Sequence, residues 1–180
     1  RLKGTQVAFL ARHGHGHRFT PSEVPYRANI WALKSLGVEQ VVSVSAVGSL
    51  QERHQPGQLR LVRQFIDRTK LRQDTFFGEG LVAHVGFAEP TCGACTDLLQ
   101  AVAREAALPV EDGATYVCME GPAFSTRAES LLHRSWGADL IGILFVARRN
   151  GDTVFTPLHK RIAIGIADIA AMALDNARLV

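Results

Sequence analysis

Cysteine, aromatic residues and long apolar runs are all scarce in this sequence. It contains 3 cysteines, and its aromatic fraction is 7%. An odd number of irregularly spaced cysteines does not provide a disulfide framework, which favours a reduced protein. The apolar run Leu140–Ala147 is short and Ile162–Leu174 is interrupted by Asp168, so neither reaches the ~18 residues of a membrane-spanning helix. Because no secretory cleavage pattern follows the N-terminus, we expect a soluble, cytoplasmic protein with no membrane partner.

A strong charge of either sign is also missing. The formal net charge is +3, and the Lys and Arg residues are spread along the chain without an aromatic ladder. Nucleic acid is therefore not an expected partner. Apolar residues make up 47% of the 180 residues and charged residues 21%, which excludes a disordered chain, a collagen-like repeat and a coiled coil. The length corresponds to one domain, or to one domain with an appendage.

Short apolar segments alternate with segments of helical periodicity along most of the chain. Segments rich in Val, Ile and Phe predict strands at Val7–Leu10, Gln40–Val44, Leu59–Ile66, Val82–Val85 and Ala114–Met119. Helical spacing predicts helices at Tyr26–Leu36, Thr96–Ala107 and Thr126–Trp136. This alternation indicates an α/β fold with a mainly parallel central sheet and helices on both faces. Such sheets bind ligands at the carboxyl ends of their strands.

The last forty residues follow a different pattern. Leu140–Ala147 reads as a strand, and Asn150-Gly151 predicts a hairpin turn after it. Thr156-Pro157 has the N-cap and first-turn proline that open a helix, which we expect to be long and amphipathic and to end near Leu179.

The first candidate site lies directly after the strand predicted at Val7–Leu10. Three of the 7 histidines, His13, His15 and His17, alternate with glycines and are flanked by Arg12. Small glycines let backbone amides approach a ligand, and an arginine fork suits oxyanions, so a phosphate cradle is one interpretation. A metal site is another, ranked lower because no Asp, Glu or Cys completes a coordination shell. An exposed polar loop is the simplest alternative.

Two further segments carry site chemistry, and each also has a simpler interpretation. The small residues from Ser43 to Ser49 close a predicted strand and could offer amides and a hydroxyl to an anion, although small residues end many strands. The Gly-Pro turn at Gly121 would hold Phe124 as a platform for a flat ring. A Phe124 side chain folded into the core is equally compatible with the sequence.

Cys92 and Cys95 have the spacing of a redox motif at the front of a predicted helix, where a thiolate is favoured. A four-ligand zinc site would need a second pair, and Cys118 is single. We therefore expect no metal site and two ordinary thiols.

Several of these segments, taken in order, resemble the methylthioadenosine phosphorylases, of the trimeric purine nucleoside phosphorylase family. The resemblance extends over about residues 5–142. The matching stretches are Arg12-His13-Gly14, Tyr26-Arg-Ala-Asn-Ile-Trp-Ala-Leu33, Ser45-Ala-Val-Gly-Ser-Leu50, Gln64-Phe-Ile-Asp-Arg-Thr69, Glu120-Gly-Pro-Ala-Phe-Ser125, Arg127-Ala-Glu-Ser130 and Trp136-Gly-Ala-Asp139. The first domain is therefore expected at residues 1–142, as an incomplete nucleoside phosphorylase-like fold.

The resemblance implies a phosphate site and a reaction. Arg12 and His13 would bind phosphate together with Ser45 and the amide of Ala46. The resemblance implies that phosphate attacks the anomeric carbon of a purine nucleoside, with methylthioadenosine as the expected substrate, while the purine leaves through a transition state resembling an oxocarbenium ion. The phosphate dianion stabilises the charge that develops on the sugar, which agrees with the electrostatic logic of catalysis. The family uses inorganic phosphate as co-substrate and needs no cofactor.

The resemblance also implies a nucleoside pocket and an assembly. Phe124 and Ser125 would line the purine and thioribose pocket. His84 would reach into the pocket of a neighbouring subunit, which implies a trimer. The residues that would choose among adenine, hypoxanthine and guanine are not identified in this sequence, and neither is a catalytic group.

The sequence departs from the family pattern at both ends. The family's N-terminal phosphate loop and its base-binding aspartates have no counterpart here, and Ile143 and Leu144 replace a Met-Thr pair. We therefore expect impaired phosphorolysis from this chain. Residues 143–180 resemble instead the last strand and closing helix of a GAF domain, through Leu144-Phe-Val-Ala147 and Phe155-Thr-Pro157. A non-catalytic fused fragment, or a GAF-type helical interaction module, is the alternative.

Overall fold

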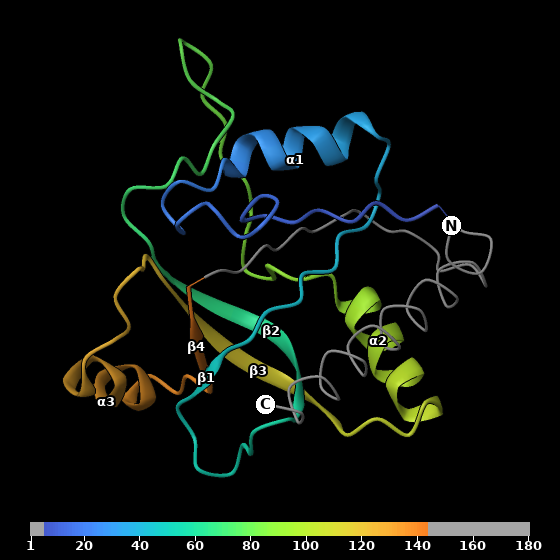
Figure 1. The fold of residues 1–180 in the computed structure, drawn as a ribbon, viewed down its shortest axis with the longest axis vertical. Helices are drawn as coiled ribbons and strands as arrows, with labels where there is room; N and C mark the ends of the chain where they lie inside the picture. Colours follow the sequence, from blue (N-terminus) through green and yellow to red (C-terminus); the bar gives the residue numbers. More distant parts are fainter. Residues whose placement is uncertain (1–5, 144–180) are drawn as a thin grey trace.

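A computed structural model of the chain describes residues 6–143 and contains a four-stranded sheet and three helices in this range. The elements follow one another as α1 (Tyr26–Ser35), β1 (Gly48–Ser49), β2 (Leu59–Arg68), α2 (Gly93–Glu105), β3 (Val110–Met119), α3 (Arg127–Ser135) and β4 (Leu140–Gly142). Figure 1 shows the sheet in the middle of these elements, with α1, α2 and α3 arranged around it.

The sheet is mainly parallel, as the alternating pattern predicted. The strand order is β1-β4-β3-β2, in which β2 pairs with β3 and β3 with β4 in parallel, while the short β1 is antiparallel to β4. Helix α2 connects the parallel neighbours β2 and β3 and packs against both, as a βαβ unit requires. The carboxyl ends of β2, β3 and β4 therefore meet at one edge of the sheet.

Strand β3 is the centre of the core, and it is buried on both of its faces. Ala114, Tyr116 and Cys118 pack with Leu140 in one cluster. Their neighbours in the alternation of the strand, Val117 and Met119, belong to a second cluster that contains Leu50, Ala138 and Ile141. Because successive side chains of a strand point to opposite faces, the two clusters lie on opposite sides of the sheet. The α/β class expected from the sequence is confirmed.

The three predicted helices are all present, with their ends shifted by a few residues. Helix α3 begins as its sequence predicted, since the Glu129 amide donates to Thr126 Oγ1 (3.2 Å) and the Thr126 amide donates to Glu129 Oε2 (2.7 Å). These two bonds form a capping box. Gly37 and Gly137 follow α1 and α3 with φ of 72° and 84°, the left-handed conformation in which helices commonly end.

Three of the predicted strands are wrong. Val7–Leu10, Gln40–Val44 and Val82–Val85 do not join the sheet, although Leu59–Ile66 and Ala114–Met119 do, within β2 and β3. An apolar β-prone sequence favours an extended backbone, but a strand also needs a neighbour that completes its hydrogen-bond ladder. Within residues 6–143, the three segments find no such neighbour. Of the predicted strand Leu140–Ala147, residues Leu140–Gly142 form β4.

The remaining predictions for the C-terminal part fall on residues that the structure does not describe. These are the end of the strand at Ala147, the turn at Asn150-Gly151, and the helix from Thr156-Pro157 to Leu179. Within the described part of the chain, no helix is long and apolar enough to cross a membrane.

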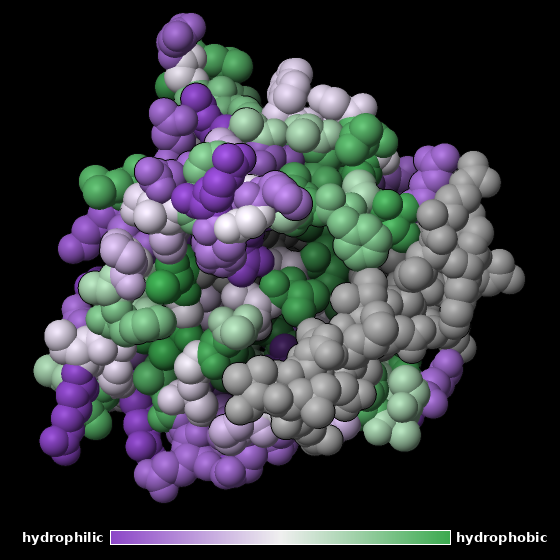
Figure 2. Space-filling model, in the orientation of Figure 1, coloured by the Kyte–Doolittle hydropathy of each residue, from purple (hydrophilic) through white to green (hydrophobic). Residues whose placement is uncertain are grey.

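Large apolar side chains are widely exposed outside the sheet. Figure 1 shows the chain between β2 and α2 projecting away from the body, and this segment contains Leu81, Val82 and Val85, which are 62%, 78% and 76% exposed. Figure 2 shows several hydrophobic patches between hydrophilic side chains on the face it presents. A globular protein usually exposes apolar side chains singly, so a concentration of them indicates a surface that another element or molecule covers.

Candidate functional site

Arg12 lies in a tight loop that its glycines make possible. The Gly14 amide donates to Ala11 O (2.8 Å), and the His17 amide donates to Gly14 O (3.1 Å). Gly14 has a φ of 75°, and a Cβ added there would lie 2.8 Å from the ring of Phe19. A side chain at position 14 would therefore strain the backbone and collide with that ring. A hydrogen bond of 2.9 Å between His13 Nδ1 and Phe19 O closes the loop.

The guanidinium of Arg12 reaches the second candidate segment directly. Nη1 donates to Val44 O (3.1 Å), and Nη2 donates to Ser45 Oγ (3.2 Å). The Ser45 hydroxyl in turn donates to Ala46 O (3.2 Å). One arginine fork thus joins the loop of Arg12 to the segment that contains Val44 and Ser45.

The charge of Arg12 is only partly solvated. Its Nε is buried and has no hydrogen-bond partner among the described residues. Burial lowers its pKa, while the nearby Tyr116 and Tyr26 oppose that change. An arginine keeps its proton at neutral pH in any case. A partly desolvated guanidinium interacts more strongly with an anion than a fully hydrated one does, and its fork matches the geometry of an oxyanion.

The imidazole rings of this loop pack against one another. The rings of His13 and His17 are stacked, with centroids 4.2 Å apart and planes at 19°. Among residues 6–143, no group of three His, Cys, Asp or Glu side chains could hold a metal ion. The stacked pair is therefore best described as part of the loop's own packing.

The segment after β3 forms the other half of the candidate site. Gly121 has a φ of 72°, and a Cβ there would lie 2.8 Å from the Ile143 side chain, so this turn also depends on glycine. The following Gly121-Pro122 peptide is cis. Phe124 is 80% exposed, which excludes the alternative that its ring folds into the core. The Ser125 and Ser130 hydroxyl oxygens lie 2.6 Å apart, which fixes Ser125 against the first turn of α3.

Arg72 is the residue that fixes this segment to the sheet. Its Nη2 donates to three carbonyl oxygens, those of Met119 (2.9 Å), Glu120 (2.8 Å) and Ile143 (2.7 Å). These carbonyls follow or end β3 and β4, so Arg72 satisfies backbone acceptors at the carboxyl edge of the sheet. The Arg72 guanidinium also lies over the ring of Tyr26, 4.9 Å from its centroid, in a cation–π contact.

The Glu120 carboxylate binds Arg72 and the backbone that follows β2. Its Oε2 accepts hydrogen bonds from the amides of Lys70 (2.5 Å) and Leu71 (3.1 Å), and its Oε1 accepts one from Arg72 Nε (3.3 Å). Burial opposes the ionisation of Glu120, but the amide hydrogen bonds and the charge of Arg72 together lower its pKa. The chain that leaves β2 is therefore bound to the chain that leaves β3.

Tyr26 connects the two halves of the site. Its hydroxyl donates to Pro21 O (2.7 Å), its ring contacts Arg72, and it interacts electrostatically with both Arg72 and Arg12. Burial raises its pKa, and the two arginines oppose that change. The N-terminal residue of α1 thus stands between the Arg12–Ser45 contact and the segment that carries Phe124.

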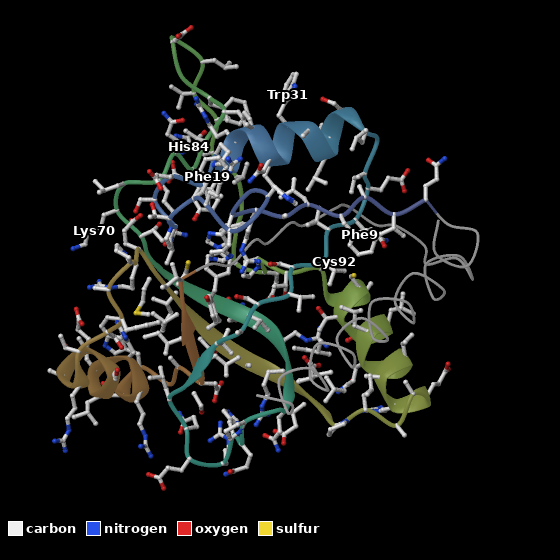
Figure 3. All side chains as sticks on the ribbon, in the orientation of Figure 1. Phe9, Phe19, Trp31, Lys70, His84 and Cys92 are labelled. Atoms are coloured by element: carbon white, nitrogen blue, oxygen red, sulfur yellow. The ribbon has the colours of Figure 1, made fainter. Side chains whose placement is uncertain are left out.

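Sequence reasoning predicted some of these residues and missed others. It singled out Arg12 and Ser45, which the structure brings together. It did not single out Arg72, because an arginine in a loop resembles any other solvated charge until its backbone partners are known. His84, labelled in Figure 3, is exposed in the segment between β2 and α2. Among the described residues it has no hydrogen-bond partner.

Comparison with known proteins identifies the family. Residues 1–148 match the phosphorylase superfamily. This match extends over most of the chain and includes both halves of the candidate site. The chain belongs to the phosphorylase superfamily.

Individual superfamily members support this assignment. The S-methyl-5'-thioadenosine phosphorylase of Koribacter versatilis is 57% identical over 142 residues, which are 79% of this chain and 49% of that protein. The S-methyl-5'-thioadenosine phosphorylase of Pyrococcus furiosus is 50% identical over 149 residues, which are 83% of this chain and 58% of that protein. The chain therefore spans about half the length of the curated relatives it matches.

Solved structures of the superfamily share the fold. A methylthioadenosine phosphorylase from an antarctic soil metagenomic library is 41% identical and superimposes with a TM-score of 0.80, over 100% of this chain and 74% of that one. A mutant adenosine/methylthioadenosine phosphorylase from Schistosoma mansoni is 38% identical, with a TM-score of 0.71 over 75% of this chain and 54% of that one. The superfamily fold seen here is thus that of the nucleoside phosphorylases.

Proposed function

We propose that the protein cleaves S-methyl-5'-thioadenosine with inorganic phosphate, giving adenine and methylthioribose phosphate. The contact of Arg12 with Ser45 is the single observation that carries this proposal, because it offers a charged fork and a hydroxyl to one oxyanion. The relatives named as S-methyl-5'-thioadenosine phosphorylases support the choice of nucleoside.

The phosphate site consists of Arg12 and His13 with Ser45 and the amide of Ala46. A phosphate oxygen forms a bond to the anomeric carbon as the bond from that carbon to the purine nitrogen breaks. The bonding electrons leave with the purine, which takes up a proton. The dianion held by Arg12 stabilises the positive charge on the sugar, and the protein contributes mainly by positioning the two reactants.

The nucleoside site consists of Phe124 and Ser125. The exposed ring of Phe124 serves as a platform for the purine, and Ser125 is directed by its contact with Ser130. Arg72 is a positioning residue here, because it holds the backbone that precedes this segment. Ile143 and Leu144 stand where the family pattern has a Met-Thr pair, so the threonine hydroxyl is missing. Impaired turnover stays a prediction made from the sequence.

The assembly in this proposal is a trimer in the cytoplasm. His84 is exposed in a segment whose apolar side chains are also exposed, as expected of a segment that inserts into a neighbouring copy. No metal or organic cofactor takes part, and phosphate is a co-substrate.

The first prediction concerns Arg12. We expect Arg12→Ala to lower kcat/KM for phosphate-dependent adenine release by about a hundredfold, because one preorganised donor to the anion is lost. The release of adenine is measured by chromatography at several phosphate concentrations.

The matched control is Arg18→Ala, which removes the same charge from an exposed position of the same loop. It should leave kcat/KM unchanged. Equal losses in the two variants, or adenine release that does not depend on phosphate, would contradict the proposed function. A complete absence of cleavage would favour the non-catalytic alternative.

A further inference from the structure

Cys92 and Cys95 occupy the first turn of α2. Cys92 is the N-cap residue, with φ −76° and ψ 106°, and Cys95 is the third residue of the helix. The Cys92 carbonyl oxygen accepts hydrogen bonds from the Thr96 amide (3.0 Å) and from Thr96 Oγ1 (3.1 Å). These bonds hold Cys92 in the register of the helix, at the end of α2 that Figure 3 labels. Both thiols are free and half-buried.

The spacing of the two cysteines suits a disulfide. Residues three apart on a helical turn are neighbours, with Cβ atoms about 5–6 Å apart. A disulfide joins residues whose Cα atoms lie roughly 4.4–6.8 Å apart and needs slightly closer Cβ atoms. Side-chain rotation leaves the Cβ atoms in place, so closing the bridge needs a small backbone movement at Cys92, which is the N-cap and whose own φ and ψ are not helical.

The two thiols are not equivalent in their surroundings. Cys92 makes no side-chain capping hydrogen bond, so the amides of the first turn are available to a thiolate on its Sγ. Cys95 lies inside the helix, where burial raises the pKa of its thiol and a charge on Cys92 raises it further. Burial therefore disfavours the thiolate form of Cys95.

The turn that carries these thiols is fixed to the sheet by Arg63 of β2. The Thr91 hydroxyl donates to Arg63 O (3.0 Å), and Arg63 Nη1 donates to Gly93 O (3.4 Å). Arg63 Nη2 also forms ion pairs with Asp97 (2.5 Å) and Asp112 (2.5 Å). The residues on both sides of Cys92 are therefore held against the sheet, which keeps the start of α2 in a defined position.

From this arrangement we infer that Cys92 and Cys95 form a redox-active dithiol site that reacts with low-molecular-weight disulfides of the glutathione type. The Cys92 thiolate attacks one sulfur of the small disulfide and expels its other half as a thiol. The Cys95 thiol then loses its proton and attacks Cys92 Sγ, which releases the second half. The protein dithiol is oxidised, the small disulfide is reduced to two thiols, and these thiols take up the two protons.

The second prediction tests this site without any nucleoside. The folded chain is treated with oxidised glutathione at neutral pH, quenched with acid and analysed by intact mass and peptide mapping. The expected product is lighter than the reduced chain by two hydrogen atoms and contains a Cys92–Cys95 disulfide, while the buried Cys118 keeps its thiol. Dithiothreitol should reverse the change.

Single variants separate the steps. We expect Cys95→Ser to accumulate one glutathione on Cys92, because the resolving thiol is gone. Cys92→Ser should react about tenfold more slowly than Cys95→Ser, since it keeps the thiol that is less readily ionised. Cys118→Ser is the matched control and should form the same disulfide as the unchanged chain.

Four results would overturn the inference, three of them from the unchanged chain and its single variants under folding conditions. These three are a chain that keeps three free thiols, a mixed disulfide that persists at Cys92 in the unchanged chain, and equal reaction rates of Cys92→Ser and Cys95→Ser. The same rate of disulfide formation in the folded chain and in urea would also overturn it, because α2 would then contribute nothing. None of these results depends on whether the protein cleaves nucleosides.

Discussion

Arg12 joins two loops that lie 33 residues apart in the chain, through bonds to Val44 and Ser45. Its planar fork reaches two acceptors at once with two different nitrogens held in a fixed geometry, whereas the ammonium of a lysine is a compact point charge. Arg72 works in the same way at the edge of the sheet, where one nitrogen serves three carbonyl oxygens. At the scale of the residue, two arginines therefore organise both halves of the candidate site, and Tyr26 stands between them.

The third prediction is also made at the residue scale. His133 is 4% exposed, and its Nδ1 has no partner among the described residues. Burial lowers its pKa from the ordinary 6.5, and the charge of Arg68 lowers it further, while Glu129 has the opposite effect. Because the folded state disfavours the protonated ring, His133 contributes stability above pH 6.5 that is lost as the pH falls through and below this value.

The free energy of unfolding, measured by urea titration over a series of pH values, checks this prediction. We expect it to fall more steeply below pH 6.5 in the unchanged chain than in His133→Gln. His15→Gln, at an exposed position, is the control and should keep the steep dependence. Parallel curves for the unchanged chain and His133→Gln would contradict the argument.

At the scale of the element, all of the predicted helices form, whereas half of the predicted strands do not. The signals that begin and end α3, Thr126 with Glu129 and then Gly137, act within a few residues of the chain. Strand formation depends on a neighbour, and β2 finds one only beyond α2, at β3. Val7–Leu10 has an equally β-prone sequence but no neighbour among the described residues, so it forms no strand.

The fourth prediction concerns the capping box of α3. Thr126→Ala should lower the free energy of unfolding by about 1 kcal/mol, because the Glu129 amide loses its acceptor. Thr126→Ser keeps the hydroxyl oxygen and should restore most of the stability. Chemical denaturation of the three proteins provides the measurement, and equal midpoints for Thr126→Ala and Thr126→Ser would show that the cap contributes little.

At the scale of the whole molecule, the exposed apolar side chains are the main unexplained feature of an otherwise ordinary α/β fold. The projecting segment concentrates them at Leu81, Val82 and Val85. Exposing such a surface to water costs about 25 cal/mol for each Å² that a partner could have covered. The proposed trimer would cover this segment and would place His84 beside the site of a neighbouring copy.

The fifth prediction tests that assembly. Val82→Glu should shift the protein toward the monomer, because a carboxylate would have to lose its hydration in the interface. Leu131→Glu makes a comparable change at an exposed position of α3 and should leave the mass unchanged. Light scattering coupled to size-exclusion chromatography measures the mass, and identical masses for the unchanged chain and Val82→Glu would contradict this role of the segment.

The sequence by itself determined the α/β class, the three helices and the strands β2 and β3, because periodicity, caps and apolar composition act over a few neighbouring residues. It also indicated which side chains carry site chemistry, such as Arg12 and Ser45. Only the tertiary structure decided that these two meet, that Arg72 holds the segment of Phe124, and that three apolar segments find no partner strand within residues 6–143. Such contacts join residues far apart in the chain, and their energies depend on distance and burial, which only the folded chain defines.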